Sequence, residues 1–201
     1  MPNKPYSQHI HDEQILVVPR KKLFDKQYWQ GLNTNTMDEL LQIIQENKEF
    51  HPRSKMETDP TYKQIIPYLV FTHNKKLFLM QRKASASEQR LKNKYSLGIG
   101  GHMRERDLHN GTSVFSWAQR EFHEEVSYNG SLTLQPLGML NDDSDAVGNV
   151  HMGLVLLLTG DTDKIAIKSE LKQGTLVEYD TCRAQYDTLE NWSKLVFDAL
   201  S

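Results

Sequence analysis

The sequence predicts an α/β fold in which helices cover a mixed β-sheet. From residue 65 onward, short apolar runs alternate with turn residues, as is typical of β-strands. Apolar side chains also recur at helical spacing over about 113–127, and again from about residue 184 to the end of the chain. Residues 1–60 differ in pattern from the rest of the chain and are too few to hold a core alone. We therefore expect an N-terminal extension packed on a main domain of residues 61–201.

The extension is expected to contain one strand and one helix. A short apolar run stopped by a proline, Gln14 to Pro19, predicts the strand. Thr36 is placed to cap a helix that ends near residue 48, with Glu39 completing a capping box. The buried side of this helix would consist of Leu40, Leu41, Ile43 and Ile44. Residues 50–59 are polar and contain a proline, so we expect a loop there.

The main domain is expected to begin with a β-hairpin. Its strands are residues 65–72 and 77–82, and His73 to Lys76 forms the turn. In the second strand, the side chains of Leu77, Leu79 and Gln81 should face one way and those of Phe78, Met80 and Arg82 the other. A polar, basic loop over 84–94 comes next. The remaining elements are strands over 95–100, 132–140, 150–159 and 164–168 and helices over about 113–127 and from about 184 onward.

The helix predicted over 113–127 carries a cluster of carboxylates. Glu121, Glu124 and Glu125 stand at positions i, i+3 and i+4, which fall on one face of a helix, and Arg120 lies one turn from Glu124. Like charges on adjacent turns repel each other, and a hard divalent cation such as Mg²⁺ relieves that repulsion because it binds oxygen ligands. Such strings are common on solvated helices. Here the neighbouring face is apolar, which indicates a docked helix: Phe115, Ala118, Phe122 and Val126.

A glycine turn stands about twenty residues before these acids. Leu97 to Gly101 predicts a strand that ends in Gly100-Gly101, where the backbone can approach an ion closely. The order of strand, glycine turn, loop and acidic helix resembles the Nudix (MutT-like) hydrolase signature, Gly-x5-Glu-x7-Arg-Glu-x-x-Glu-Glu-x-Gly. The resemblance in motif covers residues 96–130, and in strand order it covers roughly 64–200.

Two departures from the family pattern stand out. The stretch from residue 104 to 114 is about five residues longer than usual, as in an extended Nudix box of the phosphoesterase kind. Counting back from Arg120 places Thr112 where the family has its first glutamate, so either Glu105 or Asp107 is expected to take that role. The closing glycine is replaced by Ser127, and Asn129-Gly130 is a candidate for the turn instead.

The resemblance implies an α/β/α sandwich and Mg²⁺-dependent (or Mn²⁺-dependent) cleavage of a phosphoanhydride bond. By resemblance, Glu121, Glu124 and Glu125 hold the metal together with a carbonyl near Gly100, and Arg120 orients the carboxylates. The catalytic residues are then Glu124, Glu125 and Arg120. The general base stays open, and the candidates are Glu125, Asp142, Asp143, Asp145 and Glu170.

Substrate-binding residues are less clearly marked by the sequence. Arg82 ends a strand that should abut the site, and Arg53 would reach it if the N-terminal loop folds over the pocket. The basic residues Lys83, Arg90, Lys92 and Lys94 would suit an anionic substrate, although such runs are often only solvated. His102 and His123 are neighbours of the site, and His151 is expected to be a hydrogen-bonded core histidine.

Composition narrows the classes of protein. Apolar residues make up 38% and charged residues 25% of the 201 residues, as in globular domains. The net charge of −2 gives no general attraction to nucleic acid, so duplex binding is not expected. The single cysteine, Cys182, fits a reducing compartment. With no apolar run of ~18 residues and no signal-peptide core, we expect a cytoplasmic protein with no membrane partner.

The expected partner is a small phosphorylated molecule, such as a nucleoside diphosphate derivative. The apolar face of the N-terminal helix needs cover from the main domain or from a second subunit, as in a homodimer. Two alternatives remain. A prenyl-diphosphate isomerase also has a Gly-Gly-His sequence before an extended box, but it uses an active-site cysteine, and Cys182 lies in the wrong segment. A non-catalytic Nudix-like binding module would not need all three clustered acids.

Overall fold

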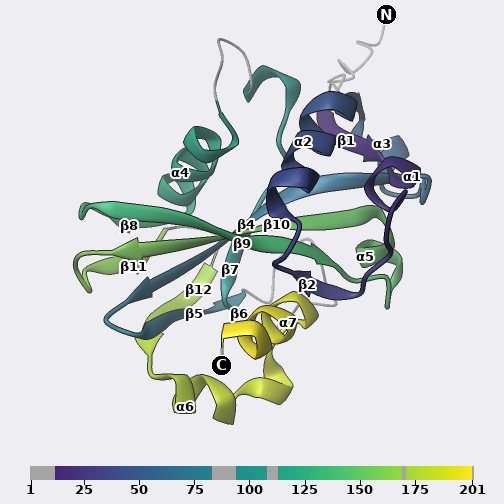
Figure 1. The fold of residues 1–201 in the computed structure, drawn as a ribbon. Coiled ribbons are helices and arrows are strands. Elements are labelled where there is room, and N and C mark those ends of the chain that lie inside the picture. The colour runs from purple at the N-terminus through teal and green to yellow at the C-terminus, as the bar shows by residue number, and fades with distance from the viewer. Residues whose placement is uncertain (1–11, 83–93, 108–112, 169–170, 201) are drawn as a thin grey trace, which may run out of the picture.

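The computed structural model describes residues 12–82, 94–107, 113–168 and 171–200, and its main feature is a mixed sheet covered by helices (Figure 1). The strands are β1 (Gln14–Pro19), β2 (Gly31–Asn33), β3 (Glu49–Pro52), β4 (Tyr62–His73), β5 (Lys76–Arg82), β6 (Tyr95–Ser96), β7 (Gly98–Gly100), β8 (Val126–Tyr128), β9 (Leu132–Asn141), β10 (His151–Gly160), β11 (Ile165–Ile167) and β12 (Leu171–Val177). The helices are α1 (Arg20–Leu23), α2 (Met37–Asn47), α3 (Arg53–Met56), α4 (Val114–Glu125), α5 (Ala146–Val150), α6 (Tyr179–Ala184) and α7 (Asn191–Leu200), with a 3-10 turn at Tyr186–Thr188.

Strand β4 organises the sheet. The main order is β12-β5-β4-β10-β9-β2, and β1, β3, β6 and β7 pair off this path. The β4 and β10 strands are parallel, whereas β4 pairs antiparallel with β1, β5 and β7. The α/β sandwich with a mixed sheet that the sequence predicts is therefore confirmed.

Two layers of apolar side chains lie on opposite faces of the sheet. Helices α2 and α4 cover one face, and α6 and α7 cover the other (Figure 1). Strand β5 shows the separation: Phe78 and Met80 belong to the first layer, and Leu77 and Leu79 to the second. This alternation confirms the predicted facing of these side chains. Among the described residues, no helix is long and apolar enough to cross a membrane.

The N-terminal segment joins the main sheet through two strands. Strand β1 pairs with β3 and β4, and β2 pairs with β9. Helix α2 buries Leu40 and Ile44, and Leu41 and Ile43 pack partly buried against the same core layer. The predicted helix is thus present, but the predicted capping box is not, because Thr36 makes no side-chain cap hydrogen bond and Glu39 pairs with Lys26.

The prediction of a loop over residues 50–59 is wrong. Residues 49–52 form β3 and residues 53–56 form α3. Strand β3 is short and mostly polar, and among the described strands it pairs only with β1, so tertiary pairing and not a local apolar pattern creates it.

The C-terminal region also differs from the predicted single helix. Strand β12, which we did not predict, pairs antiparallel with β5, and two helices follow it. The break before α7 coincides with Glu190, which is buried and accepts hydrogen bonds from Tyr68 (2.8 Å) and Ser96 (2.6 Å). These bonds hold the chain against the sheet at the point where a continuous helix would have carried it away.

Strand β7 lies tightly against β4, and this contact positions the glycine turn that follows it. A Cβ atom on Gly98 would come within 2.2 Å of the Tyr68 ring, so only glycine fits there. The Tyr68 hydroxyl also accepts a hydrogen bond from the Gly98 amide at 3.1 Å. Gly100, at the end of β7, stands opposite Tyr68 in the strand register.

Candidate active site

Helix α4 docks through an apolar face and presents its charged face to the glycine turn. Ser113 caps the helix by accepting a hydrogen bond from the Ser116 amide at 3.1 Å. Trp117, Ala118 and Phe122 are fully buried. The prediction that Phe115 lies on this buried face is wrong: its side chain is 37% exposed.

Arg120 forms ion pairs in two directions. Its Nη1 atom lies 2.6 Å from Glu124 Oε1, one turn along the helix, and its Nη2 atom lies 3.0 Å from Asp107 Oδ1. Asp107 is itself fixed, because its Oδ2 atom accepts hydrogen bonds from the Arg104 amide (3.1 Å) and Trp117 Nε1 (3.3 Å).

Of the two candidates for the missing acid, the structure places Asp107 beside Arg120. Glu105 is exposed on the same segment. Counting forward from Gly101 with the family spacing reaches Asp107 directly, whereas counting back from Arg120 crosses the extra residues. The forward count is therefore the sequence signal that identifies this residue.

The carboxylate of Glu121 lies over Gly101. A Cβ atom on Gly101 would come within 2.3 Å of Glu121 Oε1, so the carboxylate occupies the space that any other residue would fill. Burial raises the pKa of Glu121 to about 7, and the charges of Glu124 and Glu125 contribute to that rise. This carboxyl group therefore stands in surroundings with an excess of negative charge, which is the environment that a bound divalent cation would neutralise.

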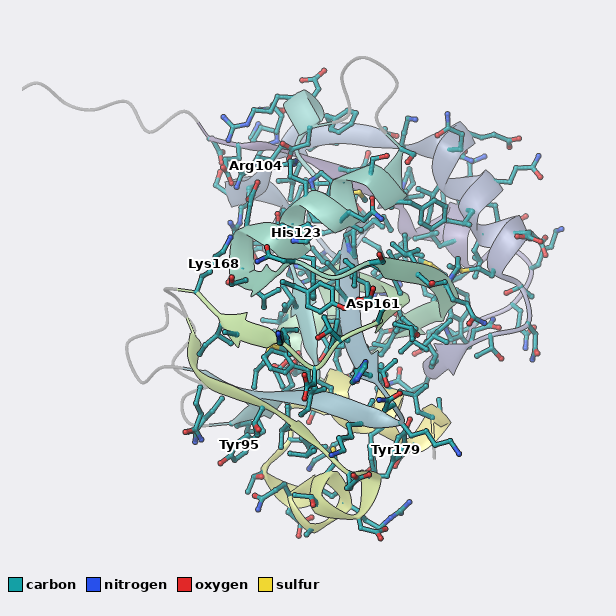
Figure 2. All side chains as sticks on the ribbon, turned by 90° about the vertical axis from the view of Figure 1, so that its left-hand side faces the viewer. Tyr95, Arg104, His123, Asp161, Lys168 and Tyr179 are labelled. Atoms are coloured by element: carbon teal, nitrogen blue, oxygen red, sulfur yellow. The ribbon has the colours of Figure 1, made fainter. Side chains whose placement is uncertain are left out.

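The three glutamates have different environments. Glu124 is more than half exposed and pairs with Arg120, whereas Glu121 and Glu125 are half-buried. The Glu125 carbonyl accepts a hydrogen bond from the Lys168 amide at 2.9 Å, which ties the end of α4 to the residues after β11. Figure 2 shows Arg104, His123 and Lys168 along the same side of the molecule, around this end of α4.

Several predicted acids serve elsewhere. Asp143 pairs with Lys63 (2.7 Å) and with Arg20, and Asp145 caps α5 by accepting from the Gly148 amide at 2.7 Å. Asp142 is buried and accepts a hydrogen bond from Gln30 at 2.8 Å. These partners favour structural roles over that of a general base. Glu170 lies outside the described residues.

The predicted substrate-binding residues are only partly described. Arg53 lies at the start of α3, where its Nε atom donates to Glu57 at 3.0 Å and its Nη1 atom is 3.8 Å from Glu13. Its charge lies close enough to His102, the residue after the glycine turn, to contribute to lowering the pKa of that ring. The side chain of Arg82 lies outside the described part of the structure, as do Lys83, Arg90 and Lys92.

Two histidines meet beside the glycine turn, which the sequence did not predict. His102 Nε2 lies 2.8 Å from Gln64 Oε1 and 3.4 Å from His151 Nε2. Burial lowers the pKa of His102 to about 3, so the ring is neutral near pH 7. His151 is 7% exposed and its Nδ1 atom donates to the Val147 carbonyl at 2.7 Å, which confirms the expected hydrogen-bonded core histidine.

The architecture and the glycine turn with its acidic helix define the Nudix hydrolase class of enzyme, which cleaves phosphoanhydride bonds. The chain is 35% identical, over an alignment of 214 residues, to Protein YmaB of Bacillus subtilis (strain 168), and the match covers 94% of this chain and 98% of YmaB. The chain is thus a relative of YmaB, and its fold and site assign it to the Nudix hydrolase family.

Solved structures agree with this assignment. The crystal structure of Tm1382, described as a candidate Nudix hydrolase, superposes with a TM-score of 0.76 at 28% identity, covering 94% of this chain and 98% of that chain. DR0079 from Deinococcus radiodurans shares the fold with a TM-score of 0.54 at 14% identity, covering 76% of this chain and 90% of that one. A scan against family models finds no match.

Proposed function

We propose that this Nudix enzyme hydrolyses a phosphoanhydride bond in a nucleoside diphosphate derivative or a related phosphorylated metabolite, with Mg²⁺ held by Glu121, Glu124 and Glu125. A backbone carbonyl near Gly100 is proposed as a further ligand. The observation that carries the proposal is the placement of Glu121 against Gly101, on the same helix face as the other two acids. Oxygen ligands on one helix face match the preference of Mg²⁺.

We assign different roles in such a reaction to the residues around the glycine turn. The glutamates position the metal, which when bound offsets phosphate charge and lowers the pKa of a coordinated water. Arg120 restrains Glu124 through their 2.6 Å ion pair, and Asp107 fixes Arg120 from the other side. Glu125, half-buried at the end of α4, is our proposed general base. Rigid outer partners of this kind hold a metal site in a productive geometry.

Substrate recognition is proposed to involve the segment around α3. Arg53 is about half exposed, and its ion pairs with Glu13 and Glu57 keep a guanidinium group near the glycine turn. A guanidinium group that can exchange its carboxylate partners for phosphate oxygens is suited to binding them bidentately. The Nudix domain of Shewanella oneidensis NrtR, which shares the fold at 14% identity with a TM-score of 0.51, was crystallised with ADP ribose. ADP-ribose is therefore one reasonable probe.

The structure does not favour an isomerase that uses an active-site cysteine. Cys182 is fully buried in α6, on the sheet face opposite α4, and burial raises the pKa of its thiol to about 11. A buried, protonated thiol on the far face cannot act at the glutamate site.

The test is a substrate screen with the full chain and Mg²⁺. Nucleotide sugars, dinucleoside polyphosphates, NADH and ADP-ribose are incubated with the protein, and products are separated by ion-exchange chromatography. We expect hydrolysis of the P–O–P linkage in at least one of these compounds, and we expect a chelator to abolish this activity. Binding of a member without cleavage, at any Mg²⁺ concentration, would favour the non-catalytic module instead.

A further inference from the structure

We propose that Glu57, His102 and His151 form a second metal site, specific for a transition-metal ion such as Zn²⁺ and separate from the glutamates of α4. Each residue offers one ligand atom, and these atoms all lie within 4.8 Å of one another. The three residues come from three different parts of the chain: the residue after α3, the turn after β7 and the first residue of β10.

The geometry of the two imidazoles fits a metal. Zinc holds histidine nitrogens at about 2.0–2.1 Å, so two nitrogens bound in a tetrahedral arrangement lie roughly 3.3–3.4 Å apart. The Nε2 atoms of His102 and His151 are 3.4 Å apart. The Glu57 carboxylate is the member that can turn toward the rings, because its side chain is 37% exposed whereas His151 is buried.

The outer contacts already orient the rings. A carbonyl can only accept, so His151 Nδ1 carries the proton donated to Val147 and its Nε2 presents a lone pair. A bond from the other ring nitrogen to a backbone carbonyl is the usual outer contact of a metal-binding histidine. Gln64 is fully buried, and its amide donates to the Met56 carbonyl at 3.1 Å, which turns Oε1 toward His102.

In the metal-free protein, the proton of His102 therefore sits on Nε2, where it faces Gln64 Oε1 at 2.8 Å. A metal that binds Nε2 moves this proton to Nδ1, and the ring stays neutral because only the tautomer changes. The Gln64 oxygen, 2.8 Å from the same Nε2 atom, is then placed to serve as a fourth ligand.

The charges around the site are balanced. Arg53 and Arg104 lie near His102, and their positive charges oppose a bound cation. Glu13 lies 3.0 Å from Arg104 Nε and 3.8 Å from Arg53 Nη1, so it offsets both. The Glu57 carboxylate accepts a hydrogen bond from Arg53 at 3.0 Å, and a bound metal would replace Arg53 as its partner. Nitrogen ligands favour Zn²⁺ or Co²⁺ over Mg²⁺, which distinguishes this site from the oxygen-only glutamates.

The test is a Co²⁺ titration of chelator-treated full-length protein, followed by the visible ligand-field bands of the bound ion. We expect one equivalent to give these bands, Zn²⁺ to displace it, and excess Mg²⁺ to leave it in place. Loss of an outer partner alone costs about 10- to 100-fold in metal affinity. The variants His102→Ala and His151→Ala should therefore weaken binding by at least that factor.

Three further variants keep the result decisive. A Glu124→Gln/Glu125→Gln variant should retain the bands, and His51→Ala serves as a matched control because His51 pairs with Glu49 and is not one of the three proposed ligands. Glu57→Gln covers the case in which the histidine variants do not fold, and it should weaken binding and reduce the rise in unfolding temperature on adding Zn²⁺. Wild-type affinity in Glu57→Gln, or bands lost in the glutamate variant, would overturn the proposal.

Discussion

The guanidinium group of Arg120 lies 3.0 Å from the carboxylate of Asp107, across the segment that joins the glycine turn to helix α4. Asp107 is 11% exposed, whereas Arg120 is 45% exposed, so the aspartate is the fixed partner of the pair. The ion pair thus links α4, the helix that carries the clustered glutamates, to the segment that precedes it, although this segment is longer than in the family pattern.

Replacing Asp107 with Asn should reduce turnover without changing the fold. The change removes the charge that restrains Arg120 and leaves the shape of the side chain intact. Outer partners of metal ligands are worth about 10- to 100-fold in activity, and we expect a loss in that range. The exposed Glu105→Gln, two residues away, should retain wild-type turnover. Equal rates for both variants would show that the Asp107 pair has no part in catalysis.

Replacing Gly101 with Ala should destabilise the protein through Glu121. The new Cβ atom would lie 2.3 Å from Glu121 Oε1, so one of the two groups must move. We expect a loss of about 1–3 kcal/mol in the free energy of unfolding, as for overpacking. In a Glu121→Ala background the obstacle is gone and the same change should cost less. A double-mutant cycle measured by urea unfolding gives the coupling, and strictly additive effects would contradict the proposed contact.

The ion pairs of Asp143 predict a loss of stability in acid. Against the effect of burial, hydrogen bonds from Arg20 and Lys63 hold the pKa of Asp143 well below its usual range. Because the unfolded-state pKa is about 3.9, the contribution is complete above that value and is lost as the pH falls toward the folded-state pKa. The fully buried Lys63 would lose its charged partner in Asp143→Asn, so we expect a cost of about 3–5 kcal/mol at neutral pH.

Urea unfolding of Asp143→Asn and wild type at about pH 7, 5 and 3 measures this effect. The variant should lose less stability than wild type between the two lower values, because it lacks the titrating group. Glu39→Gln is the control, since its ion pair with Lys26 is exposed to solvent and contributes little to stability. Parallel pH profiles for wild type and Asp143→Asn would refute the assignment.

Arg53→Ala should raise KM for the phosphorylated substrate and leave kcat nearly unchanged. A hydrogen bond to a charged group contributes about 1.5–3 kcal/mol, which corresponds to about tenfold or more in KM. Arg106→Ala is the matched control, because Arg106 is 68% exposed and lies on the segment that follows the glycine turn. If kcat falls while KM stays constant, Arg53 acts on the chemistry of the site and not on substrate binding.

The elements that follow apolar periodicity could be predicted from the sequence. Strand β1, helix α2, the β4–β5 hairpin and α4 all have buried faces that the spacing of apolar residues reveals. The polar strand β3 could not be predicted, because its pairing with β1 creates it. The break before α7 depends on the buried hydrogen bonds of Glu190 to residues about a hundred positions away.

The candidate site also has one part that local sequence predicts and one part that it does not. The acids of α4 are local in sequence, so their common face could be predicted from helical spacing. His102 and His151 come together because β7 and β10 both pair with β4, and Glu57 joins them from the residue after α3, which no local pattern reveals. The boundary between residues 60 and 61 stays a proposal, since β1 and β2 both pair with strands of the main domain.

The central claim is that the acids of α4 hold a catalytic Mg²⁺, and the most direct test is the Mg²⁺ dependence of turnover in Glu124→Gln and Glu125→Gln, with Glu105→Gln as control. The two α4 variants keep side-chain shape and remove one charge each. Because a lost outer partner already costs about 10- to 100-fold, we predict a larger fall in turnover for these changes, with a higher Mg²⁺ requirement and an unchanged unfolding temperature. Wild-type turnover and Mg²⁺ dependence in both α4 variants would contradict the claim.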